Sequence, residues 1–79
     1  MEYRFGRAIR RRRRELDLSQ EKLAERADLH RNYVSGIETG TRNPSLKNIE
    51  KLAKALDISI TRLFMEYGVE VESELEKGD

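Results

Sequence analysis

The sequence predicts an all-α protein folded as one compact five-helix bundle. Apolar residues recur at steps of three and four positions along successive segments, as they do on the buried face of a helix. Short breaks separate these segments, and serine, which caps helix starts, precedes several of them. At 79 residues the chain has room for one domain. We therefore expect a folded domain over residues 1–67 and an acidic tail over residues 68–79.

The expected helices cover residues 3–16, 20–27, 30–38, 46–56 and 60–67. Their apolar faces supply the expected core: Phe5, Ile9, Leu16, Leu23, Ala24, Leu29, Val34, Ile37, Leu46, Ile49, Leu52, Leu56 and Leu63. Arg12 falls on the apolar stripe of the first helix, so we expect its aliphatic stem to cover the core while the guanidinium reaches water. The small side chain of Ala24 should let the second and third helices cross closely.

The charge is unevenly distributed, although the net charge is only +1. Residues 1–14 hold seven arginines against one glutamate, a net charge of +6, and residues 66–79 hold six acids against one lysine, a net charge of −5. Residues 15–65 contain eight basic and eight acidic residues. Any binding of nucleic acid must therefore come from the local position of charges and not from their total.

Several classes of protein are excluded by the composition. The chain has no cysteine, so it has no disulfide and no thiolate metal site, and its single histidine cannot build a metal cluster or a catalytic dyad. It also shows no glycine-rich phosphate loop and no carboxylate pair suited to catalysis, so we expect neither an enzyme nor a cofactor. No apolar run approaches the ~18 residues of a membrane span, and no cleavable signal is visible, which favours the cytoplasm.

Residues 20–38 are the stretch around which the chain is organised, because they read as two short helices joined by a tight turn, a helix-turn-helix. The outer face of the second of these helices carries donors and small residues, and Glu38 at its end is the one acid. Arg31 can bond O6 and N7 of guanine, and Asn32 can bond N6 and N7 of adenine. We therefore predict base contacts in the major groove of double-stranded DNA from Arg31, Asn32 and Ser35.

The neighbourhood of this helix supplies predicted contacts to the DNA backbone or the groove edge. The loop over residues 39–44 is rich in donors and adjoins the helix. His30 and Tyr33 each have an alternative role, His30 as a neutral turn residue and Tyr33 as a packing residue. The predicted contacts are His30, Tyr33, Thr39, Thr41, Arg42, Asn43 and Lys47.

A resemblance to a known family rests on the order and spacing of Leu18-Ser19-Gln20, Leu23-Ala24, Ala27, Leu29, Val34, Ile37-Glu38 and Gly40. With these residues the sequence resembles the Cro/repressor-like (XRE-type) helix-turn-helix family, and the run from Asn43 to Leu56 resembles it too. The segment from Leu29 to Gly36, with Arg42-Asn43, is most similar to the controller proteins of restriction–modification systems. The resemblance covers residues 5–67 and implies a bundle of the phage-repressor DNA-binding type.

The resemblance also implies residue roles and a regulatory role. It implies that Arg13 pairs with Glu38 and that Gln20 makes a phosphate or base contact at the groove edge. The alternative for Gln20 is a solvated residue in the first helical turn. Controllers bind an operator upstream of their own gene and of a restriction enzyme gene, activate at low concentration and repress at high concentration. RNA polymerase is then a further candidate partner. The alternatives are a phage-type repressor, the antitoxin of a toxin–antitoxin pair, and a protein-interaction module that does not bind DNA.

The last expected helix carries more apolar residues than one buried face needs. This surplus predicts a homodimer, although a locally thick core is the alternative. The predicted interface residues are Ile58, Ile60, Phe64 and Tyr67. A two-fold dimer would present two recognition helices to successive major grooves about 34 Å apart. In the tail, alternation at Val69 and Val71 allows a short edge strand, and disorder is the default expectation.

Overall fold

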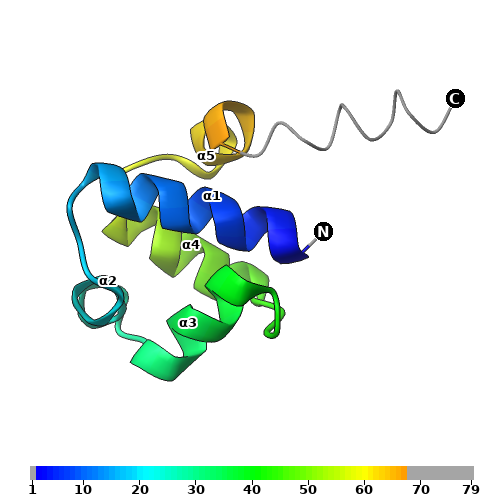
Figure 1. The fold of residues 1–79 in the computed structure, drawn as a ribbon. Helices are drawn as coiled ribbons and strands as arrows, with labels where there is room; N and C mark the ends of the chain where they lie inside the picture. Colours follow the sequence, from blue (N-terminus) through cyan, green and yellow to red (C-terminus); the bar gives the residue numbers. More distant parts are fainter. Residues whose placement is uncertain (1, 68–79) are drawn as a thin grey trace, which may run out of the picture.

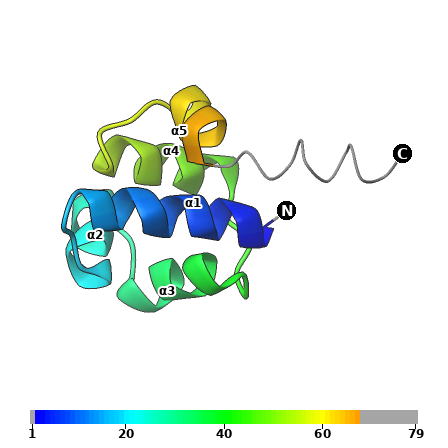
Figure 2. The ribbon, with the colours of Figure 1, turned by 45° about the horizontal axis from the view of Figure 1, so that its top comes forward.

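The computed structural model describes residues 2–67, and their side chains from Phe5 onward. Its helices are α1 (Glu2–Glu15), α2 (Gln20–Ala27), α3 (Arg31–Thr39), α4 (Leu46–Ala55) and α5 (Ile60–Tyr67). Figures 1 and 2 both show α1 lying between α3 and α5, with α2 beside the C-terminal end of α1. The all-α five-helix prediction is confirmed, with helix bounds that differ by one residue at most. The strand considered at Val69 and Val71 lies outside the described residues.

The core draws on every helix. Its largest fully buried apolar side chains are Ile9, Leu23, Ile37, Leu52, Leu56, Leu63 and Val34. Three expected core residues, Leu16, Leu29 and Ile49, are only partly buried against this cluster. The expectation for Leu46 is wrong, because its side chain is 70% exposed. Leu46 is the first residue of α4, directly after the cap, and the face of α4 that meets the core begins only at Ile49 and Leu52.

The ends of the helices follow from local chemistry. The hydroxyls of Ser19, Ser45 and Ser59 accept hydrogen bonds from backbone N–H groups in the first turns of α2, α4 and α5. After α2 the chain turns at Asp28, which has a φ of 59° in the left-handed region, and after α3 it turns at Gly40. Asp17 and Asp57 adopt the same left-handed conformation after α1 and α4. Aspartate tolerates this conformation better than most residues do, although less well than glycine.

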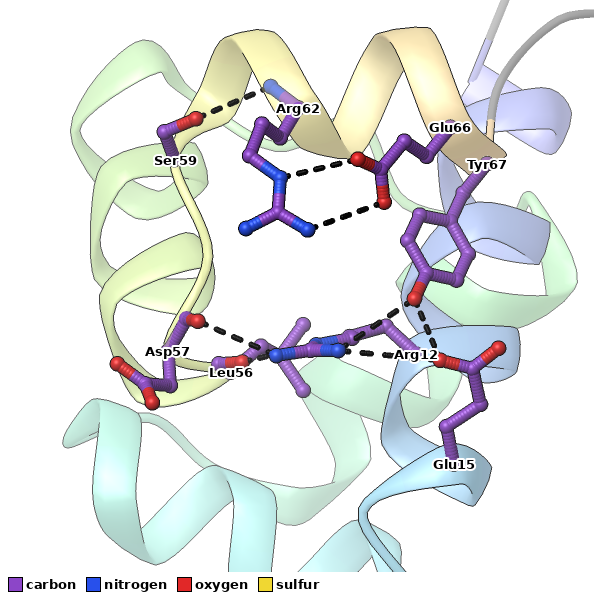
Figure 3. A network of polar contacts seen from close by, with 8 residues as sticks. All are labelled: Arg12, Glu15, Leu56, Asp57, Ser59, Arg62, Glu66 and Tyr67. Atoms are coloured by element: carbon purple, nitrogen blue, oxygen red, sulfur yellow. Dashed lines mark hydrogen bonds and ion pairs between the residues drawn. The ribbon is translucent and has the colours of Figure 1, made fainter.

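Arg12 connects α1 to the end of α4 and to α5 (Figure 3). Its guanidinium donates to the backbone carbonyls of Leu56 at 3.0 Å and Asp57 at 3.2 Å, and to the Tyr67 hydroxyl at 3.4 Å. That hydroxyl in turn donates to Glu15. The guanidinium is therefore bonded within the domain, and 18% of the side chain remains exposed. The carbonyls at a helix C-terminus have no partner within the helix, and Arg12 supplies one.

Candidate nucleic-acid interface

The turn between α2 and α3 sets the orientation of the two helices. The N–H of Leu29 donates to the carbonyl of Ala24 at 2.9 Å, which closes the end of α2 behind the left-handed Asp28. His30 then precedes α3 in extended backbone, without a side-chain capping bond. Val34 and Ile37 are fully buried, so the opposite face of α3 points outward.

That outward face of α3 carries the predicted base-reading residues. Arg31 and Asn32 are exposed, and Ser35 and Gly36 are partly buried. Neither the Arg31 side chain nor the Asn32 side chain has a hydrogen bond or ion pair with another residue of the described range 2–67. Their donors are therefore available at the start of the helix, where a recognition helix meets base edges. No acid stands between Arg31 and Ser35.

Glu38 joins the first three helices beneath this face. Arg13 donates to its two carboxylate oxygens at 2.7 and 3.0 Å, so the pair that the resemblance implied is present. Gln20, at the start of α2, donates to Oε1 of Glu38 at 3.0 Å. A side-chain amide nitrogen carries two hydrogens, so Gln20 keeps one donor for an external partner. Glu38 is only 2% exposed, which makes this cluster a buried support for the surface above it.

The loop after α3 folds back onto the helix at Gly36. The carbonyl of Gly36 accepts hydrogen bonds from the N–H groups of Thr41 and Arg42 at 2.9 and 3.1 Å. A Cβ at Gly36 would overlap with the side chain of Arg42. The Arg42 guanidinium lies over the Tyr33 ring, 5.6 Å from its centroid, and the Tyr33 hydroxyl accepts from Asn48 at 2.8 Å. Gly36, Tyr33 and Asn48 thus hold Arg42 beside α3.

The remaining predicted contacts divide into two groups. The Thr39 and Thr41 hydroxyls bond back to carbonyls of α3, which leaves them less available to DNA. His30, Asn43 and Lys47 are exposed. His30 lies in the turn before α3, Asn43 lies in the loop after α3, and Lys47 lies in the first turn of α4. Sequence reasoning missed Asn48, whose role depends on a neighbour fifteen positions away in the chain.

Gly6 is a second residue that sequence reasoning missed. It lies where α1 crosses α3, and a Cβ there would overlap with the carbonyl oxygen of Ile37 and lie 2.9 Å from Cα of Glu38. Only glycine allows the two backbones to come this close. The available signal was an isolated glycine inside a helical pattern, which usually has a packing reason.

The four predicted dimer residues differ in exposure. Ile58 and Tyr67 are buried within the single chain, at 8% and 6% exposure. Ile60 is partly buried, and Phe64 is 42% exposed with its ring packed against Phe5 at a centroid distance of 5.7 Å. Met65, beside Phe64, is 68% exposed. The exposed or partly exposed apolar surface of α5 therefore comes from Ile60, Phe64 and Met65.

Residues 2–67 offer neither a membrane span nor a metal site. None of their helices combines the length and apolar character that crossing a membrane requires. Within the same range, no three side chains of the histidine, cysteine, aspartate or glutamate type come together as metal ligands would. Together, the helix-turn-helix, its outward arginine and asparagine, and the donor-rich loop beside it define a DNA-binding protein of the phage-repressor type.

Comparison with known proteins agrees with this class. Residues 9–63 match the helix-turn-helix family. The control protein C.BamHI of Bacillus amyloliquefaciens is 56% identical over 55 residues, which is 68% of this chain and 68% of that protein. The crystal structure of the restriction–modification controller protein C.AhdI from Aeromonas hydrophila superposes with a TM-score of 0.77 at 51% identity, and the match covers 80% of this chain and 96% of that one. C.Esp1396I bound to a 19-base-pair DNA duplex superposes with a TM-score of 0.79 at 33% identity over 84% of this chain and 88% of that one.

The chain therefore belongs to the helix-turn-helix family, and within it to the restriction–modification controller proteins, which are DNA-binding transcriptional regulators. The predicted family and the predicted class of function are confirmed.

Proposed function

We propose that this chain acts as a symmetric homodimer that reads a palindromic operator with Arg31 and Asn32. The observation that carries the proposal is the exposure of both side chains at the start of α3, with their donors free of other described residues. Arg31 reads a guanine and Asn32 an adenine, because each side chain matches the donor and acceptor pattern of that base in the major groove. Ser35 and Gly36 are small enough to let the helix lie deep in the groove.

The backbone contacts on either side of α3 set the register of the recognition helix. At one side, the second amide hydrogen of Gln20 and the N-terminus of α2 face a phosphate. At the other side, Arg42, Asn43 and Lys47 face the second strand. The stacking of Arg42 on Tyr33 supports this role, because it fixes the direction of the guanidinium before DNA arrives.

The dimer forms through α5, with Ile60, Phe64 and Met65 as its apolar contacts. Ile58 and Tyr67 lie buried beneath them and hold α5 against the rest of the domain. A two-fold axis makes the same patch contact itself and gives a closed dimer. One related controller, C.Esp1396I, has been crystallised as a tetramer with its natural operator of 35 base pairs. That assembly supports a paired arrangement for this chain as well.

The regulatory role that we propose is control of a restriction–modification operon in the bacterial cytoplasm, including the gene for this protein itself. The similarity to control proteins such as C.BamHI supports it. Binding beside the promoter would then bring the protein into contact with RNA polymerase when it activates and would exclude the polymerase when it represses.

Selection of bound sites from a random pool of double-stranded DNA tests the proposal. We expect enrichment of a two-fold symmetric sequence whose half-sites lie about 10 base pairs apart, centre to centre, because the two helices enter successive grooves. Each half-site should contain a G·C and an A·T pair within reach of one helix. Enrichment of a single unpaired half-site, or no enrichment at all, would contradict the proposal. A reporter gene behind the selected site, at low and high protein levels, then gives the sign of regulation.

A further inference from the structure

A basic cleft lies outside the helix-turn-helix, between α1 and the C-terminal end of α3. It has a volume of about 500 Å³ and is lined by Arg7, Arg10, Arg11, Glu38 and Thr39. Arg7 and Arg11 are exposed residues of α1, and Arg10 is partly exposed. None of these arginines belongs to the surface assigned above to base or backbone contact.

The cleft is electropositive because its one acid is already neutralised. Arg13, which does not line the cleft, holds both oxygens of Glu38 and cancels its charge locally. Arg10 approaches Oε1 of Glu38 only as a longer contact of 3.5 Å. Its Nε is buried and lacks a hydrogen bond to any residue that the structure describes. The cleft is therefore lined by arginine side chains around a carboxylate that is already paired.

Two contacts connect the residues of the cleft with those of the proposed DNA-binding surface. Oxygen Oε1 of the buried Glu38 contacts both Arg10 and Gln20, the first residue of α2. Thr39 lines the cleft and is the last residue of the recognition helix α3. These contacts place the arginines of α1 next to the start of α2 and the end of α3.

We propose that this cleft binds the phosphodiester backbone of DNA, with Arg7 and Arg10 as the phosphate ligands. This inference rests on the proposed DNA-binding function and extends its footprint to α1. An acidic polypeptide, including the acidic tail of the same chain, is the competing occupant. We favour DNA because the cleft adjoins the recognition helix and the start of α2, where phosphates already have to lie. Guanidinium groups bind phosphate by paired, charge-assisted hydrogen bonds.

The experiment measures the salt dependence of operator binding by the full-length chain and four variants. Arg7→Ala and Arg10→Ala each remove one ligand, and Arg10→Lys keeps the positive charge. Lys54→Ala is the matched control, because it removes a positive charge from an exposed residue in the last turn of α4. Thermal melting of each variant checks that the domain is folded. If Arg10→Ala loosens the cluster around Glu38, the result for Arg7→Ala still tests the proposal.

Removing one phosphate ligand should make the slope of log affinity against log salt concentration shallower by about 0.9, or by twice that for a dimer. We expect this change for Arg7→Ala and Arg10→Ala, and the parental slope for Arg10→Lys and Lys54→Ala. Unchanged slopes in both alanine variants, with operator binding intact, would overturn the cleft proposal alone. Tighter DNA binding by these variants would also overturn it, because removal of a phosphate ligand weakens binding. Failure of the parent to prefer its operator would instead contradict the proposed function.

Discussion

Arg13 of α1 holds Glu38 of α3 by two parallel hydrogen bonds of 2.7 and 3.0 Å. Arg13 also donates to the carbonyl of Leu18 at 2.7 Å, in the connection to α2. The pair therefore ties the first helix both to the recognition helix and to the chain segment that leads into α2. Glu38 is almost fully buried. The pair therefore stabilises the domain only while both charges are present, because a buried charge without its partner is strongly destabilising.

Replacing Glu38 by glutamine should destabilise the domain strongly. The amide keeps the shape of the side chain but leaves the buried Arg13 charge without a partner, which costs about 3–5 kcal/mol in such sites. Urea denaturation followed by circular dichroism measures the loss. An unfolding midpoint equal to that of the parent would show that the pair contributes nothing to stability.

The matched control is Glu66→Gln on the exposed side of α5. There the hydrogen bond from Arg62 lowers the pKa of the Glu66 carboxyl and raises that of the Arg62 guanidinium. A carboxyl group whose pKa is lowered by folding stabilises the domain at pH values above its pKa in the unfolded chain. This stabilisation is lost as the pH falls through the pKa of the folded state. Since both groups are exposed, solvent screens the pair, and the control should unfold almost like the parent.

Two glycines should respond differently to alanine. At Gly6 the new methyl group would meet the backbone of α3, which cannot move without separating two helices, so Gly6→Ala should cost about 1–3 kcal/mol or more. At Gly36 it would meet the flexible side chain of Arg42, so Gly36→Ala should stay folded but bind the operator more weakly. Melting curves and operator titrations separate the two effects. A Gly6→Ala variant as stable as Arg14→Ala, an exposed control on α1, would contradict the close helix crossing.

The sequence was most informative where a local rule determines the structure. Serine caps mark the starts of α2, α4 and α5, and helical spacing identifies Val34 and Ile37 as core residues. The outward direction of Arg31 and Asn32 then follows from the same periodicity. Most of the fold and the recognition face could therefore be predicted from short-range patterns.

The sequence was least informative where a contact joins distant segments. No local pattern shows that Gly6 meets Ile37, or that Arg12 bonds to the end of α4 and to Tyr67. Tyr67 fits a dimer surface by its spacing, yet that network buries it within one chain. Leu46 fits the helical period but lies at the exposed first turn. The surroundings of such residues depend on the relative positions of the helices, which composition and spacing do not reveal.

Replacing Asp28 by glycine should stabilise the domain. Asp28 has a φ of 59° after α2, where a side chain is strained and glycine is not. We expect a gain of about 1 kcal/mol, measured by urea denaturation, because the left-handed conformation costs an L residue roughly 1–2 kcal/mol and the freer backbone of glycine in the unfolded chain offsets part of that. Glu25→Gly is the control of opposite sign, because glycine inside an exposed helix costs about 1 kcal/mol. If Asp28→Gly lowered stability as Glu25→Gly does, the left-handed turn would be contradicted.

Replacing Met65 or Phe64 by serine should weaken the dimer without unfolding the domain. Met65 is the safer test, because it is 68% exposed, whereas Phe64 also packs on Phe5. Sedimentation equilibrium should show a parent dimer and a shift toward monomer in the variants. Lys51→Ser on α4 is the control and should sediment like the parent. A parent that remains monomeric at high micromolar concentration would rule out self-association through α5.

The most direct test of the account compares Arg31→Ala with Arg42→Ala on the selected operator and on a scrambled duplex, at several salt concentrations. Arg31→Ala should lose about 1–3 kcal/mol per half-site on the operator and relax the preference at one G·C pair, with little effect on the scrambled duplex. Arg42→Ala should weaken both duplexes alike and flatten the salt slope by about one per half-site. If Arg31→Ala kept the full preference for the operator, Arg31 would not read a base, and the central claim about α3 would be contradicted.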